Sequence, residues 1–206
     1  MITIIDYGMG NLRSVQKAFE RVGHEALVTN DPNRVAEASK VVLPGVGAFE
    51  DAISELKRLD LVSVVHDAID SGKPFFGICL GLQLLFDRSY EHGTHEGLGI
   101  LPGECVRFDL PPEYSVPHMG WNEVTQEQNN HPLWQNIPQH SRFYFVHSYY
   151  VKPDDSQFST ATTCYPEPFS CALKHNNIFA VQFHPEKSQS VGIQLLQNFL
   201  HWDGTN

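Results

Sequence analysis

The chain has 206 residues, of which 41% are hydrophobic and 18% charged, and its formal net charge is −10. This length and composition suit one globular domain with a continuous core and exclude a disordered chain. The acidic balance, without a cluster of Lys or Arg, argues against nucleic acid or an anionic membrane as a partner.

The first half of the chain alternates between short apolar segments and helical patterns. Four apolar strands are predicted, at residues 2–5, 26–29, 40–44 and 74–78. Apolar residues recur at helical spacing in three further segments, 12–22, 61–69 and 80–86. Strands that are apolar on both faces and alternate with amphipathic helices predict a parallel sheet with helices on each side.

The chain changes character after about residue 97, where proline and aromatic residues become frequent. Short alternating segments such as FYFVHSYYV predict antiparallel strands, IFAVQF predicts another buried strand, and residues 188–202 predict a closing helix. We therefore expect a single α/β domain over residues 1–206. Its open, mostly parallel, flavodoxin-like sheet is flanked by helices and extended by antiparallel strands in the second half.

The pentapeptide Gly77-Ile78-Cys79-Leu80-Gly81 lies between a predicted strand and a predicted helix. Its spacing is that of a nucleophile elbow, in which the side chain of the hinge residue stands above the sheet edge. Free amides at a helix start favour a thiolate, and the amide of Leu80 would face an oxyanion formed beside Cys79. A buried, inert cysteine in a glycine-loosened turn is the alternative at this point.

A thiol nucleophile needs a proton acceptor, and the sequence AVQFHPEKS offers one at the end of a strand. His184 ends the strand, and Glu186 two residues later can accept a hydrogen bond from its imidazole. In α/β-hydrolases the acid precedes the histidine, so the order found here argues against that class. A surface loop that contains His-Pro-Glu by chance is the alternative.

A second glycine-rich turn, Pro44-Gly45-Val46-Gly47-Ala48, follows the third predicted strand. Its backbone amides could complete an oxyanion hole at the same sheet edge, although an ordinary strand-to-helix turn explains it equally well. The four cysteines show no zinc-type spacing and are expected to be reduced thiols, with no metal site. No membrane span or signal-peptide pattern is found, so we expect a cytoplasmic protein.

Together, the segments GICLGLQLLF, FHPE and PGVGAF resemble the nucleophile, base/acid and oxyanion segments of class I, triad-type glutamine amidotransferases. Five segments are similar to the glutaminase subunits of imidazole glycerol phosphate synthases, namely IIDYGMGNLRSV, LPGVGAF, VPHMGWN, YFVHSYYV and FHPEKSQSVG. The resemblance spans nearly the whole chain. It implies hydrolysis of L-glutamine to glutamate and ammonia through a cysteine thioester, in histidine biosynthesis and without a cofactor.

The resemblance also implies roles for individual residues. Cys79 would be the nucleophile, His184 the general base and acid, and Glu186 the carboxylate that orients it. The oxyanion hole would involve Val46, Gly47 and Leu80. Substrate contacts would come from Gln83, His147, Ser148 and Tyr149.

Finally, the resemblance implies a heterodimer with a (β/α)8-barrel cyclase. That subunit would use the ammonia to make imidazole glycerol phosphate and aminoimidazole carboxamide ribonucleotide. The interface residues would be Tyr7, Met9, Asn11, Met119, Trp121 and Lys187, although Trp121 judged by itself suits a core position. A stand-alone cysteine hydrolase, a non-catalytic subunit and another type of amidotransferase are the rival readings.

Overall fold

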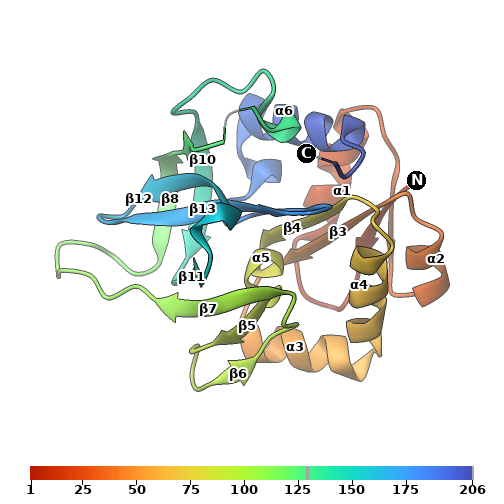
Figure 1. The fold of residues 1–206 in the computed structure, drawn as a ribbon, viewed down its shortest axis with the longest axis horizontal. Helices are drawn as coiled ribbons and strands as arrows, with labels where there is room; N and C mark the ends of the chain where they lie inside the picture. The colour runs from red at the N-terminus through yellow and green to blue at the C-terminus, as the bar shows by residue number, and fades with distance from the viewer. Residues whose placement is uncertain (129, 206) are drawn as a thin grey trace.

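A computed structural model describes residues 1–128 and 130–205, and an eight-stranded sheet crosses the molecule (Figure 1). Its strands run in the order β2 (Ala26–Thr29), β1 (Ile2–Ile5), β3 (Lys40–Gly45), β4 (Phe75–Cys79), β14 (Ile178–Val181), β13 (Pro168–His175), β12 (Ser159–Cys164) and β9 (Thr125–Gln126). The first five are parallel and the last three antiparallel. The predicted α/β class, with antiparallel strands appended to a parallel sheet, is confirmed.

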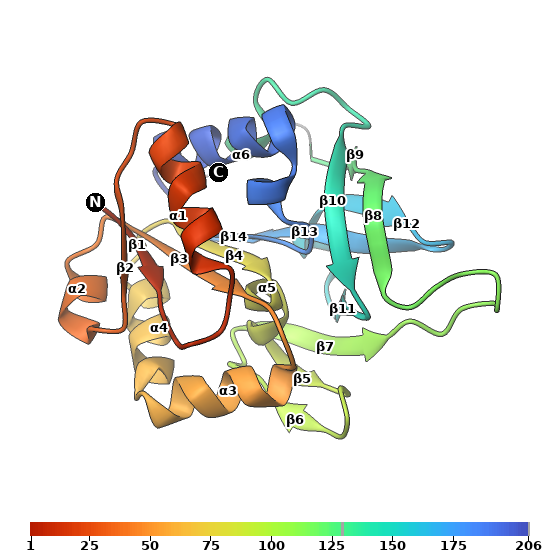
Figure 2. The same cartoon turned by 180° about the vertical axis from the view of Figure 1, so that it is seen from behind.

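Helices cover both faces of this sheet, as the two opposite views show (Figures 1 and 2). One face carries α1 (Leu12–Arg21) and α6 (Gln189–His201), and the other carries α2 (Pro32–Ala36), α3 (Phe49–Arg58), α4 (Leu61–Asp70) and α5 (Leu80–Leu84). Successive strand residues point to opposite faces. Phe76 accordingly packs in the first core and Phe75 in the second, which is why the central strands are apolar throughout.

Two smaller sheets stand beside the large one. Antiparallel strands β8 (His118–Glu123) and β10 (Arg142–His147) form one of them. The other has the order β11 (Tyr149–Pro153), β7 (Leu101–Arg107), β5 (Phe86–Ser89) and β6 (His95–Glu96). The segment FYFVHSYYV therefore divides at Ser148 between two sheets. Three short 3-10 helices complete the described elements, η1 (Pro132–Trp134), η2 (Ser156–Phe158) and η3 (Pro185–Lys187).

The helix predicted over residues 80–86 ends at Leu84, and Phe86 already belongs to β5. Distant backbone groups explain the early end. The amide of Leu98 donates to the carbonyl of Leu84 at 2.8 Å, and the amide of Leu101 donates to that of Leu85 at 2.9 Å. These carbonyls are satisfied by the chain returning from residues 98–101 and need no further helical turn. Neither α2 nor α3 was predicted from the sequence.

Candidate active site

The turn after β4 holds Cys79 in a strained backbone conformation, with φ 55° and ψ −108°. Its flanking glycines let backbone pack directly on backbone. A Cβ added to Gly81 would lie 1.8 Å from the carbonyl oxygen of Leu43, and one added to Gly77 would lie 3.1 Å from the carbonyl oxygen of Gly81. A side chain at Gly81 would push the turn off the sheet, whereas one at Gly77 would crowd its neighbours and make them shift slightly. The Gly-x-Cys-x-Gly spacing is therefore a packing requirement of this turn.

His184 lies just beyond the end of β14, the strand that pairs with β4. Its Nδ1 donates to Oε1 of Glu186 at 2.8 Å, and both side chains are almost fully buried. Since a carboxylate can only accept, the proton of the neutral ring sits on Nδ1. Nε2 is buried without a hydrogen-bond partner among the described residues, and Cys79 lines the same cavity.

Charge at this cluster shifts the titration of the imidazole. Burial by itself lowers the pKa of His184, but the thiolate of Cys79 and the hydrogen bond to Glu186 outweigh burial and raise the pKa to about 10. His184 therefore keeps its proton at neutral pH and is positively charged. A charged proton donor thus lies beside the cavity that Cys79 lines.

A cavity of about 300 Å³ opens over Cys79. The predicted catalytic, oxyanion and substrate residues that line it are Val46, Gly47, Cys79, Leu80, Gln83, His147, Ser148, Tyr149 and His184. Glu186 stands behind His184, outside the cavity lining. Segments from β3, β4, β10 and the end of β14 are thereby brought to one edge of the large sheet. This is the edge at which open parallel sheets form their sites.

The loop after β3 is held at its two ends. The hydroxyl of Tyr7 donates to the carbonyl of Pro44 at 2.9 Å, and the amide of Phe49, at the start of α3, donates to Oε2 of Glu91 at 2.7 Å. Between these anchors, Val46 is 37% exposed and Gly47 has φ +102°. The two predicted oxyanion residues of this loop therefore sit in its least restrained part.

Two polar residues of the site were missed by the sequence analysis. Gln182 is fully buried, donates from Nε2 to Sγ of Cys79 at 3.7 Å, and accepts from Nε2 of Gln83 at 3.1 Å. The sequence could have indicated Gln182, because a glutamine is unusual inside the apolar run AVQF. It lies two residues before His184 and therefore on the same side of the strand. Glu91 lines the cavity with a carboxylate but has no local sequence signal.

Of the predicted interface residues, Met119 is 66% exposed and Trp121 is 44% exposed, so a core position for Trp121 is wrong. The Trp121 ring packs edge-on against Tyr144, and Nζ of Lys187 lies 5.8 Å from the centre of that tyrosine ring. These side chains form one exposed aromatic and apolar patch. Met9 and Asn11 are half-buried.

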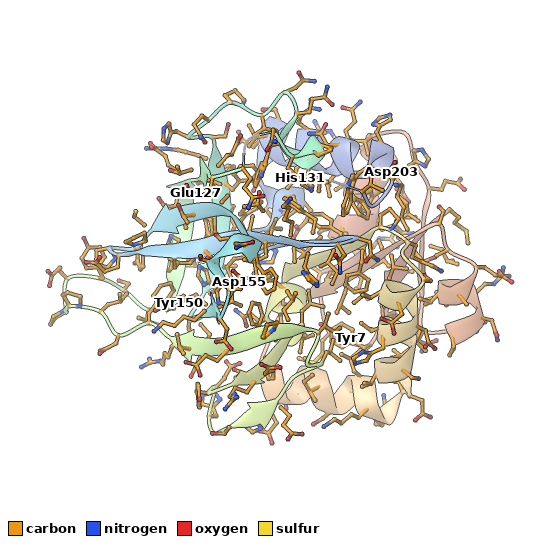
Figure 3. The ribbon with its side chains drawn as sticks, viewed as in Figure 1. Tyr7, Glu127, His131, Tyr150, Asp155 and Asp203 are labelled. Atoms are coloured by element: carbon orange, nitrogen blue, oxygen red, sulfur yellow. The ribbon has the colours of Figure 1, made fainter. Side chains whose placement is uncertain are left out.

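Tyr7 requires a correction, because its side chain is completely buried and cannot form part of a docking surface. Figure 3 shows it inside the fold, on the side of the sheet covered by α3 and α4. A Cβ added to Gly45 would lie 2.3 Å from the tyrosine hydroxyl, so Tyr7 packs directly beneath the loop that carries Val46 and Gly47. Its position suits support of that loop from inside.

Residues 1–128 and 130–205 contain no group of three His, Cys, Asp or Glu side chains arranged to hold a metal ion. The four cysteines are free, with Cys164 exposed and the other three buried. No helix of the described part is both long and apolar enough to cross a bilayer.

Comparison with known proteins adds independent findings. The family model described as glutamine amidotransferase class-I matches residues 3–202. A protein of Rhodopirellula baltica named imidazole glycerol phosphate synthase subunit HisH is 54% identical over 199 residues, covering 97% of this chain and 96% of that protein. A protein of the same name from Nitrosospira multiformis is 54% identical over 210 residues, covering 98% and 97%.

Solved structures are similar at the level of the fold. One described as PurLQS from Thermotoga maritima superposes with a TM-score of 0.77 at 18% identity, covering 97% of each chain. Another, described as a glutamine amidotransferase, has a TM-score of 0.76 at 16% identity and covers 98% of each chain. At such identities the likeness concerns the arrangement of the sheet and its helices.

Proposed function

Because the chain belongs to the class I glutamine amidotransferase family, we propose that it is the glutaminase subunit of an imidazole glycerol phosphate synthase. It hydrolyses L-glutamine to glutamate and ammonia. The single observation that carries the proposal is the cluster of Cys79, His184 and Glu186 beside one cavity, in which Glu186 accepts from Nδ1 of His184 and leaves Nε2 available for the thiol chemistry. Relatives that are about half identical over nearly their whole length supply the name of the enzyme.

The chemistry follows from the charge state of the cluster. The Cys79 thiolate attacks the side-chain amide carbon of glutamine and forms a C–S bond. The His184 imidazolium gives its proton to the departing nitrogen, so ammonia leaves and a thioester remains. The now neutral His184 takes a proton from water, whose oxygen attacks the thioester and releases glutamate and the thiolate. Glu186 keeps the imidazole in one tautomer and supports its positive charge.

Each attack places negative charge on the amide or thioester oxygen. The backbone amide of Leu80, at the start of α5, and that of Gly47 are the donors we assign to this oxyanion. Leu80 is fixed by the packed turn around Cys79. The Gly47 amide depends on the conformation of the exposed loop that contains Val46.

Recognition of glutamine needs a partner for its α-ammonium group. Glu91 is the one acidic side chain among the described residues that line the cavity, and we assign it this role. One of its oxygens accepts from the amide of Phe49, which holds the carboxylate in place. Gln83, His147, Ser148 and Tyr149 supply further polar groups for the rest of the amino-acid head.

The partner we propose is a (β/α)8-barrel cyclase, forming a heterodimer through the surface around Met119 and Trp121. Exposed methionine and tryptophan side chains are typical of the centre of an interface. Free ammonia would be protonated in water and would lose its nucleophilic lone pair. Direct transfer to a second active site is therefore the chemical reason for a partner.

The deciding experiment measures glutamine hydrolysis by the purified chain alone and with a barrel cyclase carrying its nucleotide ligand. We expect weak activity alone and strong stimulation in the complex. Full activity of the isolated chain would instead favour a stand-alone cysteine hydrolase.

A second arm uses Cys79→Ala in the complex. The variant should lose glutamine-dependent synthesis and keep synthesis from added ammonia. Loss of both reactions together would show that the proposed division between the two subunits is wrong.

A further inference from the structure

Beside the triad, a line of polar groups begins on strand β8 and leads inward. Nδ2 of Asn122 lies 3.2 Å from Nε2 of His118, and Nδ1 of His118 lies 3.0 Å from Nε2 of His147. Nδ1 of His147 lies 2.8 Å from the carbonyl oxygen of Tyr149. Both histidines are buried. Two imidazoles in direct contact inside a protein need a definite arrangement of their protons.

That arrangement follows by elimination. A carbonyl can only accept, so Nδ1 of His147 carries a proton and its Nε2 is the acceptor. Nδ1 of His118 must then be the donor to His147, and Nε2 of His118 accepts from the amide of Asn122. Burial lowers the pKa of His118 to about 4 and that of His147 to about 3, so both rings are neutral near pH 7.

The line continues to the sulfur of Cys79. The carbonyl of Tyr149 also accepts from Nε2 of Gln83, at 2.9 Å. The same amide nitrogen donates to Oε1 of Gln182 at 3.1 Å, which turns Nε2 of Gln182 toward Sγ of Cys79. A side-chain amide has its donor and its acceptor on opposite sides. The bond from Nε2 of Gln83 to the Tyr149 carbonyl therefore fixes the orientation of the Gln83 amide. The bond from Gln83 to Oε1 of Gln182 in turn points Nε2 of Gln182 at the sulfur.

From this geometry we propose that Gln182 is a catalytic residue that donates a hydrogen bond to the Cys79 thiolate, and that His118 is a positioning residue that fixes its orientation through His147 and Gln83. The inference rests on the proposed function only in treating Cys79 as the nucleophile. A hydrogen bond to the charged form stabilises that form. Gln182 thus stabilises the thiolate by a hydrogen bond from a neutral amide, without donating a proton to the reaction.

His118 also occupies a particular place in the fold. Its ring is stacked between Phe145 and Tyr165, at centroid distances of 4.9 and 4.1 Å. The next residue along β8, Met119, is one of the most exposed apolar side chains of the described chain. The line of hydrogen bonds therefore starts on the strand that carries the proposed docking surface.

The test follows the reaction of Cys79 with iodoacetamide as a function of pH, with each alkylated peptide quantified by mass spectrometry. Exposed Cys164 serves as the internal reference. The other titratable groups that line the cavity are His184, His147, Tyr149 and Glu91, with Tyr7 close to Cys79 and Glu186 bonded to His184, and none of them is changed in the variants. This readout needs no glutamine, so it can succeed or fail independently of the glutaminase assay.

Gln182→Met keeps the length of the side chain and removes the donor. We expect the pH of half-maximal alkylation to rise by about one unit, the size expected for a lost hydrogen bond to a charged group. An unchanged midpoint would overturn the assignment of Gln182.

His118→Phe keeps the stacked ring and removes the donor to His147, and a rise of roughly half a unit is expected for this more distant effect. His118→Asn places an amide nitrogen near the position of Nδ1 and should restore the wild-type midpoint. If His118→Asn behaves like His118→Phe, the donated hydrogen bond is not what holds the midpoint and the proposal fails.

The double variant of His118→Phe and Gln182→Met decides whether the two residues act in series. Its midpoint should match that of Gln182→Met alone, because His118 acts only through Gln182, whereas independent effects would add. As a packing control, Phe145→Leu removes a ring stacked on His118 without touching a hydrogen bond. It should lower the melting temperature and leave the midpoint in place. A shifted midpoint in this control would mean that packing around His118, and not its hydrogen bond, sets the midpoint, and would overturn the assignment of His118.

Discussion

Two loops end at the same cavity and are held in opposite ways. The turn after β4 is fixed by backbone packed on backbone, and Cys79 at its centre is only 6% exposed. The loop after β3 is anchored at its ends by Tyr7 and Glu91, while Val46 between them is 37% exposed. The proposed nucleophile therefore takes its position from the rigid sheet, whereas the proposed oxyanion amide of Gly47 depends on an exposed loop.

Of the changes predicted here, Glu186→Gln should have the largest effect on activity. It acts on His184, which lies beside the rigid turn that carries Cys79. The amide removes the negative charge that supports the imidazolium and can present a donor to Nδ1, which favours the wrong tautomer. We expect kcat for glutamine hydrolysis in the complex to fall by about a thousandfold or more. Synthesis from added ammonia is the control and should persist. A fall of less than about tenfold would mean that Glu186 does not orient His184.

Gly81→Ala tests the packing of the nucleophile turn. The new Cβ would meet the carbonyl of Leu43, a backbone atom that cannot yield, so the free energy of unfolding should fall by about 3 kcal/mol or more. Gly72→Ala is the matched control, because Gly72 has φ +78° but no neighbour within 4 Å. It should cost about 1 kcal/mol. Equal losses in urea denaturation would contradict a packing role for Gly81.

The ion pair between Cys79 and His184 can be tested by measuring how stability depends on pH. Although burial opposes it, the Cys79 thiolate raises the folded-state pKa of His184 from 6.5 to about 10. For His184 alone, the stabilisation is fully present below pH 6.5 and is lost as pH rises toward 10, by at most about 1.4 kcal/mol per pH unit. The unfolded chain holds a proton on the Cys79 thiol up to about pH 8.5, which offsets this loss, so the net fall in stability is expected above about pH 8.5. Urea denaturation from pH 6 to 10 should show a flatter profile for Cys79→Ser, and identical slopes would contradict the ion pair.

Gly47→Ala makes the corresponding change in the open loop. Its Cβ would meet only the flexible end of Met9, 2.7 Å away, although φ +102° is strained for alanine. We expect a loss of about 1 kcal/mol in unfolding free energy. In the complex, kcat should fall by about tenfold or more if the Gly47 amide is the oxyanion donor we propose, because the substitution displaces it. A stability loss as large as that of Gly81→Ala would erase the distinction between the two loops.

Tyr7→Phe should have the smallest effect. It removes the hydroxyl that donates to Pro44 and leaves a buried carbonyl without this partner, at a cost of about 1 kcal/mol. Thermal unfolding measures the loss. Affinity for the cyclase should not change directly, since Tyr7 is buried. A specific loss of cyclase binding at unchanged stability would restore Tyr7 to the interface.

The parts of the site that were predictable depend on short stretches of chain. Gly77, Cys79 and Gly81 lie within one pentapeptide, and their spacing reflects steric demands of a single turn that any reader of the sequence can recognise. His184 and Glu186 are two residues apart, so their hydrogen bond is also local. The alternation of apolar strands and helices predicted the parallel half of the sheet for the same reason.

What the tertiary structure decided involves partners distant in the chain. The hydrogen bond between Gln182 and Gln83 joins residues 99 positions apart, and that between His118 and His147 joins residues 29 positions apart. No local sequence pattern predicts either bond. Carbonyls satisfied from residues 98–101 end α5 early. Tyr7 is buried and Trp121 exposed because of what packs around each, a property of the folded surroundings that residue type alone does not specify.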